Sequence, residues 1–322
     1  MGADTHGRRR MSHLLPALRS RRGAAERRAL VVMAVLVLVW GYSWVLSKMA
    51  LAYCGPLDLA TLRTAIGTAA LFPALVRICK RVWPEHPLEA FGVGIVQTSL
   101  FLVLNNWALS VGEPGKTSIL VFTMPFWVLI FAWPLLGERM QGVRWVAVTL
   151  AAGGLLVILE PWGARSSLLG ELLAVLAGAC WALGVVISKG LHNRHPVDVF
   201  NFTFWQMVLG LIPMLAVVYV SHDRTIAWTP QFIALVLVLG TVATGGGWMA
   251  WFYVLRSLPA GTTSMSSLGI PVVALLSSAL QLGERPTSAE WIGMGLIALA
   301  LALVSWDTIR RHQPVEALMG QE

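Results

Sequence analysis

The side chains that could do chemistry in this chain are amides, hydroxyls and indoles inside long apolar stretches. All sixteen acidic residues and all seven histidines lie in tails, loops or the ends of apolar runs. The apolar interiors therefore lack a carboxylate pair, a buried histidine base and an H-E-x-x-H motif. His192 and His195 have metal-ligand spacing, but no Cys or acid completes a set, so a solvated loop is expected there. We predict no enzyme activity, no metal and no cofactor.

Uncharged polar groups are the main candidates for contact with a substrate. Gln97, Asn105 and Asn106 lie in one apolar run, and Gln206 and Thr244 lie in two others. An amide placed in hydrocarbon needs a hydrogen-bonding partner. The partner is either a neighbouring helix, in which case the amide is structural, or a transported molecule. We predict that these five residues bind substrate.

Tryptophan is abundant, with 15 among the 322 residues. Several sit at the ends of apolar runs, as in the aromatic belts of membrane proteins. Trp40, Trp181 and Trp248 lie deeper and predict an aromatic wall for flat or apolar groups, ordinary packing being the alternative. Trp40 and Trp181 occupy matching positions of the repeat described below, so they should face each other across its axis.

Three residues are candidates for gating. Pro125 and Pro271 fall near the middle of long apolar runs, where a proline kinks a helix and frees a carbonyl group. Gly246 is the centre of a triple-glycine run that permits close approach or hinging. Arg63 is the one charge inside its apolar run. We expect it to snorkel, with substrate contact as the alternative, and we expect Lys48 to snorkel as well.

The elements that must position these side chains are membrane-spanning helices. The chain is 57% hydrophobic and 12% charged, against about 25% charged in soluble domains. Its formal charge of +8 is spread over loops, so it does not indicate nucleic-acid binding, and the expected surroundings are a lipid bilayer. Basic residues concentrate in the tail and in alternate loops, which predicts that both termini are cytoplasmic. The ten predicted spans are 29–47, 58–76, 90–111, 117–137, 145–159, 172–188, 199–221, 226–255, 258–283 and 291–306.

The chain contains an internal duplication. Gly137-Glu138-Arg139 recurs as Gly283-Glu284-Arg285, each preceded by a proline and followed by a tryptophan at equal spacing. We interpret each triplet as a helix end, with a local role. The halves run from 29 to 160 and from 168 to 307, between tails at 1–28 and 308–322. Five spans per half is an odd number, so the second half is inverted, which places a substrate site near the midplane between the halves.

These motifs resemble those of the ten-helix EamA-type members of the drug/metabolite transporter superfamily. The resemblance rests on Trp40-Gly41-x-Ser43 leading to Lys48, and on Pro125 leading to Gly-Glu-Arg and Trp145, with their second-half equivalents. It implies an all-α integral membrane fold, a basket of helices around a central cavity. It also implies export of amino acids and related metabolites, while other members handle nucleosides, sugars on nucleotides or drugs.

We therefore predict a multi-pass inner-membrane exporter of amino acids, including aromatic ones, that works by alternating access. The alternatives are a nucleoside or drug carrier of the same fold, or a membrane enzyme or receptor without flux. The lack of a carboxylate or histidine at depth favours facilitated diffusion or exchange. The family resemblance points the other way, because relatives with an essential buried Glu are proton-coupled. A homodimer through the fifth and tenth spans is one possibility and a monomer the other. Small residues on these spans are Ala147, Ala151, Gly154, Gly293, Gly295 and Ala298.

Overall fold

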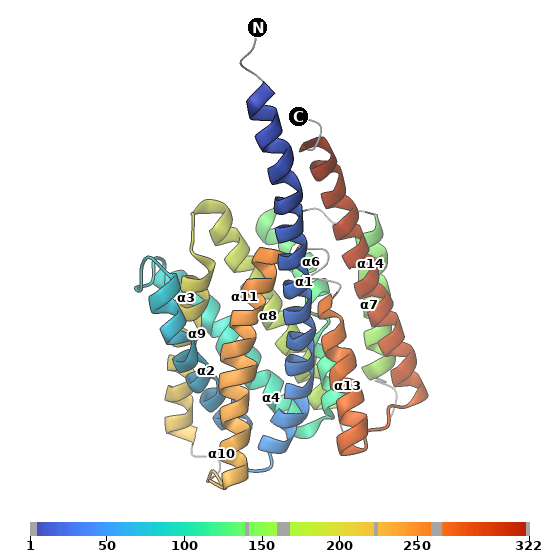
Figure 1. Ribbon diagram of the computed structural model, residues 1–322. Helices are drawn as coiled ribbons and strands as arrows, with labels where there is room; N and C mark the ends of the chain where they lie inside the picture. The colour runs from blue at the N-terminus through green and yellow to red at the C-terminus, as the bar shows by residue number, and fades with distance from the viewer. Residues whose placement is uncertain (1–4, 139–141, 160–167, 222–224, 259–265, 320–322) are drawn as a thin grey trace.

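The protein is a bundle of helices whose two chain termini extend from the same end (Figure 1). The computed structural model describes residues 5–138, 142–159, 168–221, 225–258 and 266–319, and within these ranges the regular structure is entirely helical. We call the end that carries the termini the terminal side, the upper end in Figure 1, and the opposite end the far side. Within the described residues, eight helical segments are long and apolar enough to span a membrane, and two shorter apolar helices accompany them. The all-α membrane fold is confirmed, and each of the ten predicted spans overlaps one of these helices. Residues 259–265 of the ninth predicted span lie outside the described residues.

The first half holds five helical segments, two of which are subdivided. The third changes from α to π geometry and back, and the fourth is broken between its two parts. The elements are α1 (Thr5–Ala50), α2 (Pro56–Ile78), α3 (Pro87–Val93), η1 (Gly94–Leu100), α4 (Phe101–Val111), α5 (Pro114–Val121), α6 (Met124–Leu136) and α7 (Val143–Leu159).

The second half repeats this pattern of elements. Its third segment again contains a π-helical stretch in the middle. The elements are α8 (Leu168–Arg194), α9 (Val199–Ser221), α10 (Pro230–Leu237), η2 (Val238–Gly246), α11 (Gly247–Ser257), α13 (Gly269–Leu282) and α14 (Ser288–Met319).

The two halves interlock instead of standing side by side. Helix α1 packs on α13 of the other half, and its counterpart α8 packs on α6. In the same way α2 packs on η2, and α9 packs on η1. Each of these contacts is thus matched by a second one with the roles of the halves exchanged, as expected for an inverted duplication.

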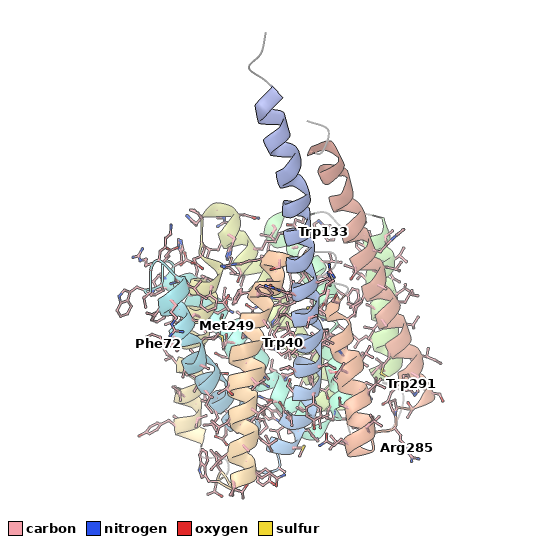
Figure 2. All side chains as sticks on the ribbon, viewed as in Figure 1. Trp40, Phe72, Trp133, Met249, Arg285 and Trp291 are labelled. Carbon is pink, nitrogen blue, oxygen red and sulfur yellow. The ribbon has the colours of Figure 1, made fainter. Side chains whose placement is uncertain are left out.

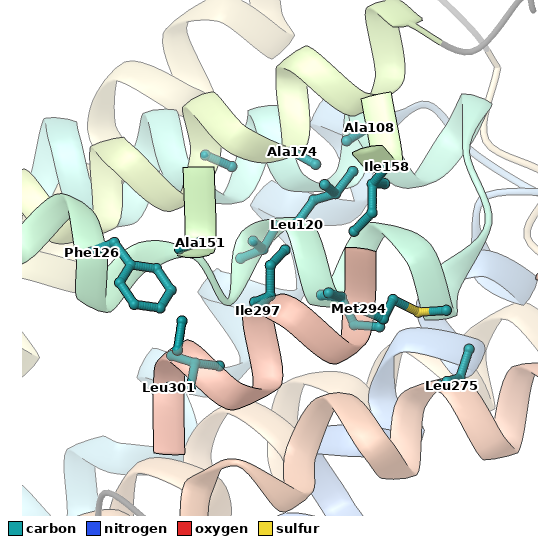
Figure 3. Packing of buried hydrophobic residues seen from close by; sticks show 14 of the residues in the cluster. Ala108, Leu120, Phe126, Ala151, Ile158, Ala174, Leu275, Met294, Ile297 and Leu301 are labelled. Carbon is teal, nitrogen blue, oxygen red and sulfur yellow. The ribbon is translucent and has the colours of Figure 1, made fainter. Parts of the chain in front are cut away.

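Helices α7 and α14 close one flank of the bundle by packing on each other (Figure 1). A Cβ added at Gly154 would come within 2.7 Å of the carbonyl oxygen of Gly293, so the backbones touch at these glycines. Buried residues around this contact include Ile158, Met294 and Ile297 (Figure 3). Most small residues considered above for a dimer are therefore used within the chain, although Gly295 and Ala298 are exposed.

The π-helical stretches share a local feature. In η1 the hydroxyl of Ser99 donates to the carbonyl oxygen of Gly94, and in η2 that of Thr244 donates to Leu239, each five residues back. Ser99 also donates to the carbonyl oxygen of Gly210 on α9, at 2.5 Å. In both halves a side-chain hydroxyl thus donates to a backbone carbonyl within the π-helical stretch. These carbonyls depart from the regular α-helical hydrogen-bonding pattern.

The gating prolines lie beside helix breaks and not in mid-helix kinks. Helix α5 ends at Val121, and Pro125 stands in the first turn of α6. Pro271 likewise stands in the first turn of α13, after a turn residue at Leu268. Proline is tolerated in a first turn because the N–H that it lacks has no partner there. The helical run is interrupted at the predicted places, but by a break between two helices and not by a kink within one.

Candidate functional site

A cavity of about 300 Å³ lies between the two halves. Residues from α1, α2, η1, α4, α5, α6, α8, α9, η2, α11 and α13 line it. Trp40, on its wall, lies midway along the bundle in Figure 2. The lining is mostly aromatic and aliphatic. It includes five tryptophans, three amide side chains and one charged residue: Trp40, Trp44, Trp181, Trp248, Trp251, Gln97, Asn105, Gln206 and Arg63.

Most of the predicted substrate-binding residues line this one cavity. They are Trp40, Gln97, Asn105, Trp181, Gln206, Thr244 and Trp248, joined by Pro125. Asn106, Gly246 and Pro271 are not among the lining residues. Asn106 is fully buried beside the cavity, and neither atom of its amide has a partner among the described residues. Pro271 borders a separate apolar pocket against α14.

The amides form the polar part of the cavity wall. The Nε2 of Gln206 donates to the Oε1 of Gln97 at 3.2 Å, which joins α9 to η1 across the two halves. Asn105 is buried, and its Oδ1 accepts no hydrogen bond from the described residues. An unsatisfied buried acceptor costs free energy unless a bound molecule or water supplies a donor.

The tryptophans form an aromatic wall. The Nε1 of Trp40 donates to the carbonyl oxygen of Ala243 at 2.8 Å, and its ring packs on Trp248 and Trp251. Trp181 lines the same cavity, but Trp40 has its closest ring contacts with α11. Sequence reasoning placed Trp44 deep in its span without assigning it to the site, and it missed Trp251. Their spacings of four and three residues from Trp40 and Trp248 place each pair on one helix face.

Gly247, and not Gly246, allows the closest approach within the triple-glycine run, and Gly245 also packs tightly, against α2. A Cβ at Gly247 would overlap the indole nitrogen of Trp40, whereas the nearest atom to a Cβ at Gly246 is a carbonyl oxygen 3.4 Å away. The close approach expected of the triple-glycine run is real and falls one residue later.

Arg63 does not snorkel toward the membrane surface, as the sequence had suggested; it lines the cavity. Its Nη1 donates to the hydroxyl of Ser47 at 3.3 Å, and its buried Nε has no partner among the described residues. The signal was present in the sequence, since Arg63 is the one charge inside an otherwise apolar span.

Three carboxylates at the far side of the bundle are buried, although they lie at helix ends and outside the apolar runs. Glu171, Glu284 and Glu290 are each less than a tenth exposed. The Nζ of Lys116 lies 2.5 Å from Glu171 and 2.8 Å from Glu290, so one ammonium group joins α5, α8 and α14. We call Lys116, Glu171, Glu284 and Glu290 the far-side charge cluster.

Glu284 has a long-range role and not the local one assigned to the Gly-Glu-Arg triplet. Gly283 ends α13 with a φ of 70°, as predicted for a helix end. The carboxylate of Glu284 then accepts the N–H of Gly115 at 3.0 Å, across the halves at the start of α5. Burial raises the pKa of Glu284 to about 6, and the nearby Glu113 carboxylate adds to the rise while the Gly115 hydrogen bond opposes it.

Lys48 does not snorkel either. Its Nζ donates to the carbonyl oxygens of Leu109, Ser110 and Gly112 at 2.8, 3.1 and 2.7 Å. These carbonyls end α4, where a cation also meets the negative end of the helix dipole. Lys48 therefore anchors the far end of α1 to the loop that leads to Gly115.

The matching residues on the terminal side are paired more loosely. Lys189 and Glu138 are the repeat counterparts of Lys48 and Glu284, and they form an ion pair of 2.6 Å with side chains 49% and 39% exposed. Gly137 ends α6 with a φ of 69°, like Gly283. Arg139 lies outside the described residues. The two ends of the bundle thus carry equivalent charges in unequal states: buried on the far side and solvated on the terminal side.

Comparison with known proteins settles the family. The model of the EamA-like transporter family matches the chain twice, over residues 27–160 and 168–306. The chain belongs to the EamA-like transporter family. This EamA-like protein is a multi-pass membrane protein of a transporter type, and its ten-helix fold agrees with the family assignment.

Named relatives agree with the family. The chain is 31% identical to the uncharacterized transporter YvbV of Bacillus subtilis (strain 168), over 87% of this EamA-like chain and 92% of the relative. It is 28% identical to a protein of Escherichia coli (strain K12) described as a probable amino-acid metabolite efflux pump, over 84% and 92%. A crystal structure of another protein, 19% identical, superposes with a TM-score of 0.60 over 89% of this chain and 99% of that one, and supports the fold alone.

Proposed function

We propose that this protein exports amino acids, including aromatic ones, and related small metabolites across the plasma membrane by alternating access, with both termini cytoplasmic. The observation that carries the proposal is the cavity of about 300 Å³ between the inverted halves, lined by tryptophans and amides. Its volume lies at the lower end of the range for small-molecule sites, which suits a metabolite of amino-acid size.

The lining supports this substrate class. Flat or apolar side chains pack well on Trp40, Trp181 and Trp248, while Gln97 and Asn105 offer hydrogen bonds to the polar groups of an amino acid. The relatives described as probable amino-acid metabolite efflux pumps, in Escherichia coli and Salmonella typhimurium, support the same class. A cationic drug fits less well, because the described residues on the cavity wall include Arg63 and neither Asp nor Glu.

Counterflow of labelled amino acids into proteoliposomes tests the proposal. We expect exchange of aromatic amino acids without an imposed pH gradient, and a loss of about tenfold or more for Trp181→Ala, because that ring lines the cavity. Trp291→Ala is the matched control, since Trp291 is exposed on α14. Absence of counterflow for every amino acid would contradict the proposal, and stronger competition by nucleosides would favour the nucleoside carrier. A strict requirement for the gradient would replace facilitated exchange with proton coupling.

A further inference from the structure

Arg63 is the one charged side chain among the described residues that line the cavity. It enters from α2, and no carboxylate of the described residues acts as its ion-pair partner. A cation inside an apolar span, without a carboxylate partner, is costly unless something neutralises it. Its position therefore calls for an anion that comes and goes with the transported molecule.

The hydrogen bonding of Arg63 is also incomplete. A guanidinium group has five N–H donors arranged as a planar fork. Arg63 gives one bond to the hydroxyl of Ser47 at 3.3 Å, while its buried Nε–H has no acceptor among the described residues. Carboxylate and phosphate groups can each accept two parallel N–H bonds from such a fork. The proposed amino-acid substrates carry the carboxylate.

The residues near Arg63 indicate the chemistry of the rest of the ligand. Trp40, Ser43, Trp44 and Ser47 line the cavity at spacings of three and four residues, so one face of α1 presents indoles alternating with hydroxyls. Arg63 meets that face at Ser47, its far-side end. Indoles along the remainder of the face suit a flat or apolar body attached to the carboxylate.

We propose that Arg63 binds the carboxylate of the substrate and that the cavity selects amphipathic monocarboxylates, molecules with one carboxylate and a flat or apolar body. The inference rests on the proposed transport function and narrows its substrate class. An α-ammonium group is accepted but not required, because the groups that can receive it are neutral, such as the unpartnered Oδ1 of Asn105. Amines that lack a carboxylate are rejected by the charge of Arg63.

The test measures ligand binding to the purified full-length protein in detergent, by the shift of its thermal unfolding midpoint and by quenching of tryptophan fluorescence. The probes share one phenyl-ethyl skeleton: 3-phenylpropanoate has the carboxylate only, phenylalanine has both charges, and phenethylamine has the ammonium only. We expect the two carboxylates to bind and the amine not to bind. Chloride at equal concentration tests whether any small anion binds. If chloride stabilised the protein as much as the carboxylates do, the proposed selection for an apolar body would be overturned.

Variants of Arg63 complete the test. Arg63→Gln should weaken binding of both carboxylates about ten- to a hundredfold, the usual value of a charged hydrogen-bonded contact. Arg63→Lys keeps the charge without the fork and should restore part of that loss. Arg77→Gln is the matched control, being an exposed arginine near the end of the same helix, and should bind like the wild type.

Three results would overturn the assignment: binding of phenethylamine as tight as that of the carboxylates, unchanged carboxylate affinity in Arg63→Gln, or no binding of either carboxylate. The first and third are read from the wild-type protein, so they hold even where Arg63→Gln fails to fold. The outcome is separable from that of the counterflow experiment. Arg63-dependent binding without flux would contradict transport and support the carboxylate site. Flux of substrates that does not depend on Arg63 would support transport and contradict the carboxylate site.

Discussion

At the scale of single residues, the cavity wall depends on how Trp40 is held. Its indole N–H is fixed by the carbonyl oxygen of Ala243, one ring face meets Trp251, and the space for the indole nitrogen exists because Gly247 has no side chain. The backbone conformation at Gly247 is ordinary right-handed helix, so the requirement for glycine there is one of volume alone.

Gly247→Ala should therefore displace Trp40. Overpacking of this kind costs about 1–3 kcal/mol, so we expect a lower thermal unfolding midpoint in detergent together with weaker substrate binding. Gly246→Ala is the matched control because the nearest atom to its new methyl group lies at ordinary contact distance, 3.4 Å. An alanine in a helix interior is favoured over glycine by about 0.5–1 kcal/mol, so this variant should be as stable as the wild type or more so. Equal losses in both variants would contradict the explanation.

At the scale of elements, the sequence was enough to predict the ten spans, the glycine helix ends and the interruptions at Pro125 and Pro271. Those features follow from apolar length, positive φ and the missing proline N–H, which are all local. The predictions for Arg63, Lys48 and Glu284 were wrong because their partners lie on other helices: Lys48 meets the end of α4, and Glu284 meets Gly115. The displacement of Asn106 from the cavity likewise depends on the local pitch of η1, which hydropathy does not report.

Lys116 is the residue that ties elements together on the far side. It neutralises Glu171 of α8 and Glu290 of α14, whose side chains are only 7% and 11% exposed. Lys116→Met should cost about 3–5 kcal/mol, because removing one partner leaves buried charge unpaired. The triple variant Lys116→Met, Glu171→Gln, Glu290→Gln should recover much of the loss. The measurement is the thermal unfolding midpoint of each variant in detergent.

The opposite end supplies the control for that prediction. Lys189→Met removes an ion pair whose side chains are 49% and 39% exposed. Surface pairs contribute about 0–1 kcal/mol, so this variant should unfold close to the wild-type midpoint. If the Lys116 and Lys189 variants lost equal stability, the burial of the far-side charge cluster would have no energetic consequence.

At the scale of the whole molecule, equivalent charged residues are buried at the far side of the bundle and solvated at the terminal side. Alternating access requires two states of similar free energy in which the halves exchange roles. Under the proposed transport cycle, a buried Glu284 bound to Gly115 on the far side and a solvated Glu138 on the terminal side correspond to a state closed at the far side.

Acid should stabilise that state through Glu284. Its pKa in the folded protein is about 6, above the ordinary value of 4.5. The folded form therefore binds the proton more tightly, so the stabilisation is complete below about pH 4.5 and is lost as the pH rises through 6. Unfolding midpoints measured between pH 4.5 and 7 should fall with rising pH in the wild type and fall less in Glu284→Gln. Glu138→Gln, at the solvated counterpart, should keep the wild-type profile; a flattened profile there would contradict the assignment to Glu284.

The π-helical stretches η1 and η2 suggest how one half could change conformation in the proposed transport cycle. A π turn holds one residue more than an α turn, so if η1 became α-helical, α4 would rotate by roughly the 100° that separates neighbouring residues on an α-helix. Asn105 and Asn106 are neighbours of this kind: one faces the cavity, and the other is buried with an unpaired amide. The rotation would bring Asn106 to the cavity in place of Asn105, so that the chain would hold two alternative polar linings on one helix. A far-side-open structure with Asn105 still on the cavity wall would exclude it.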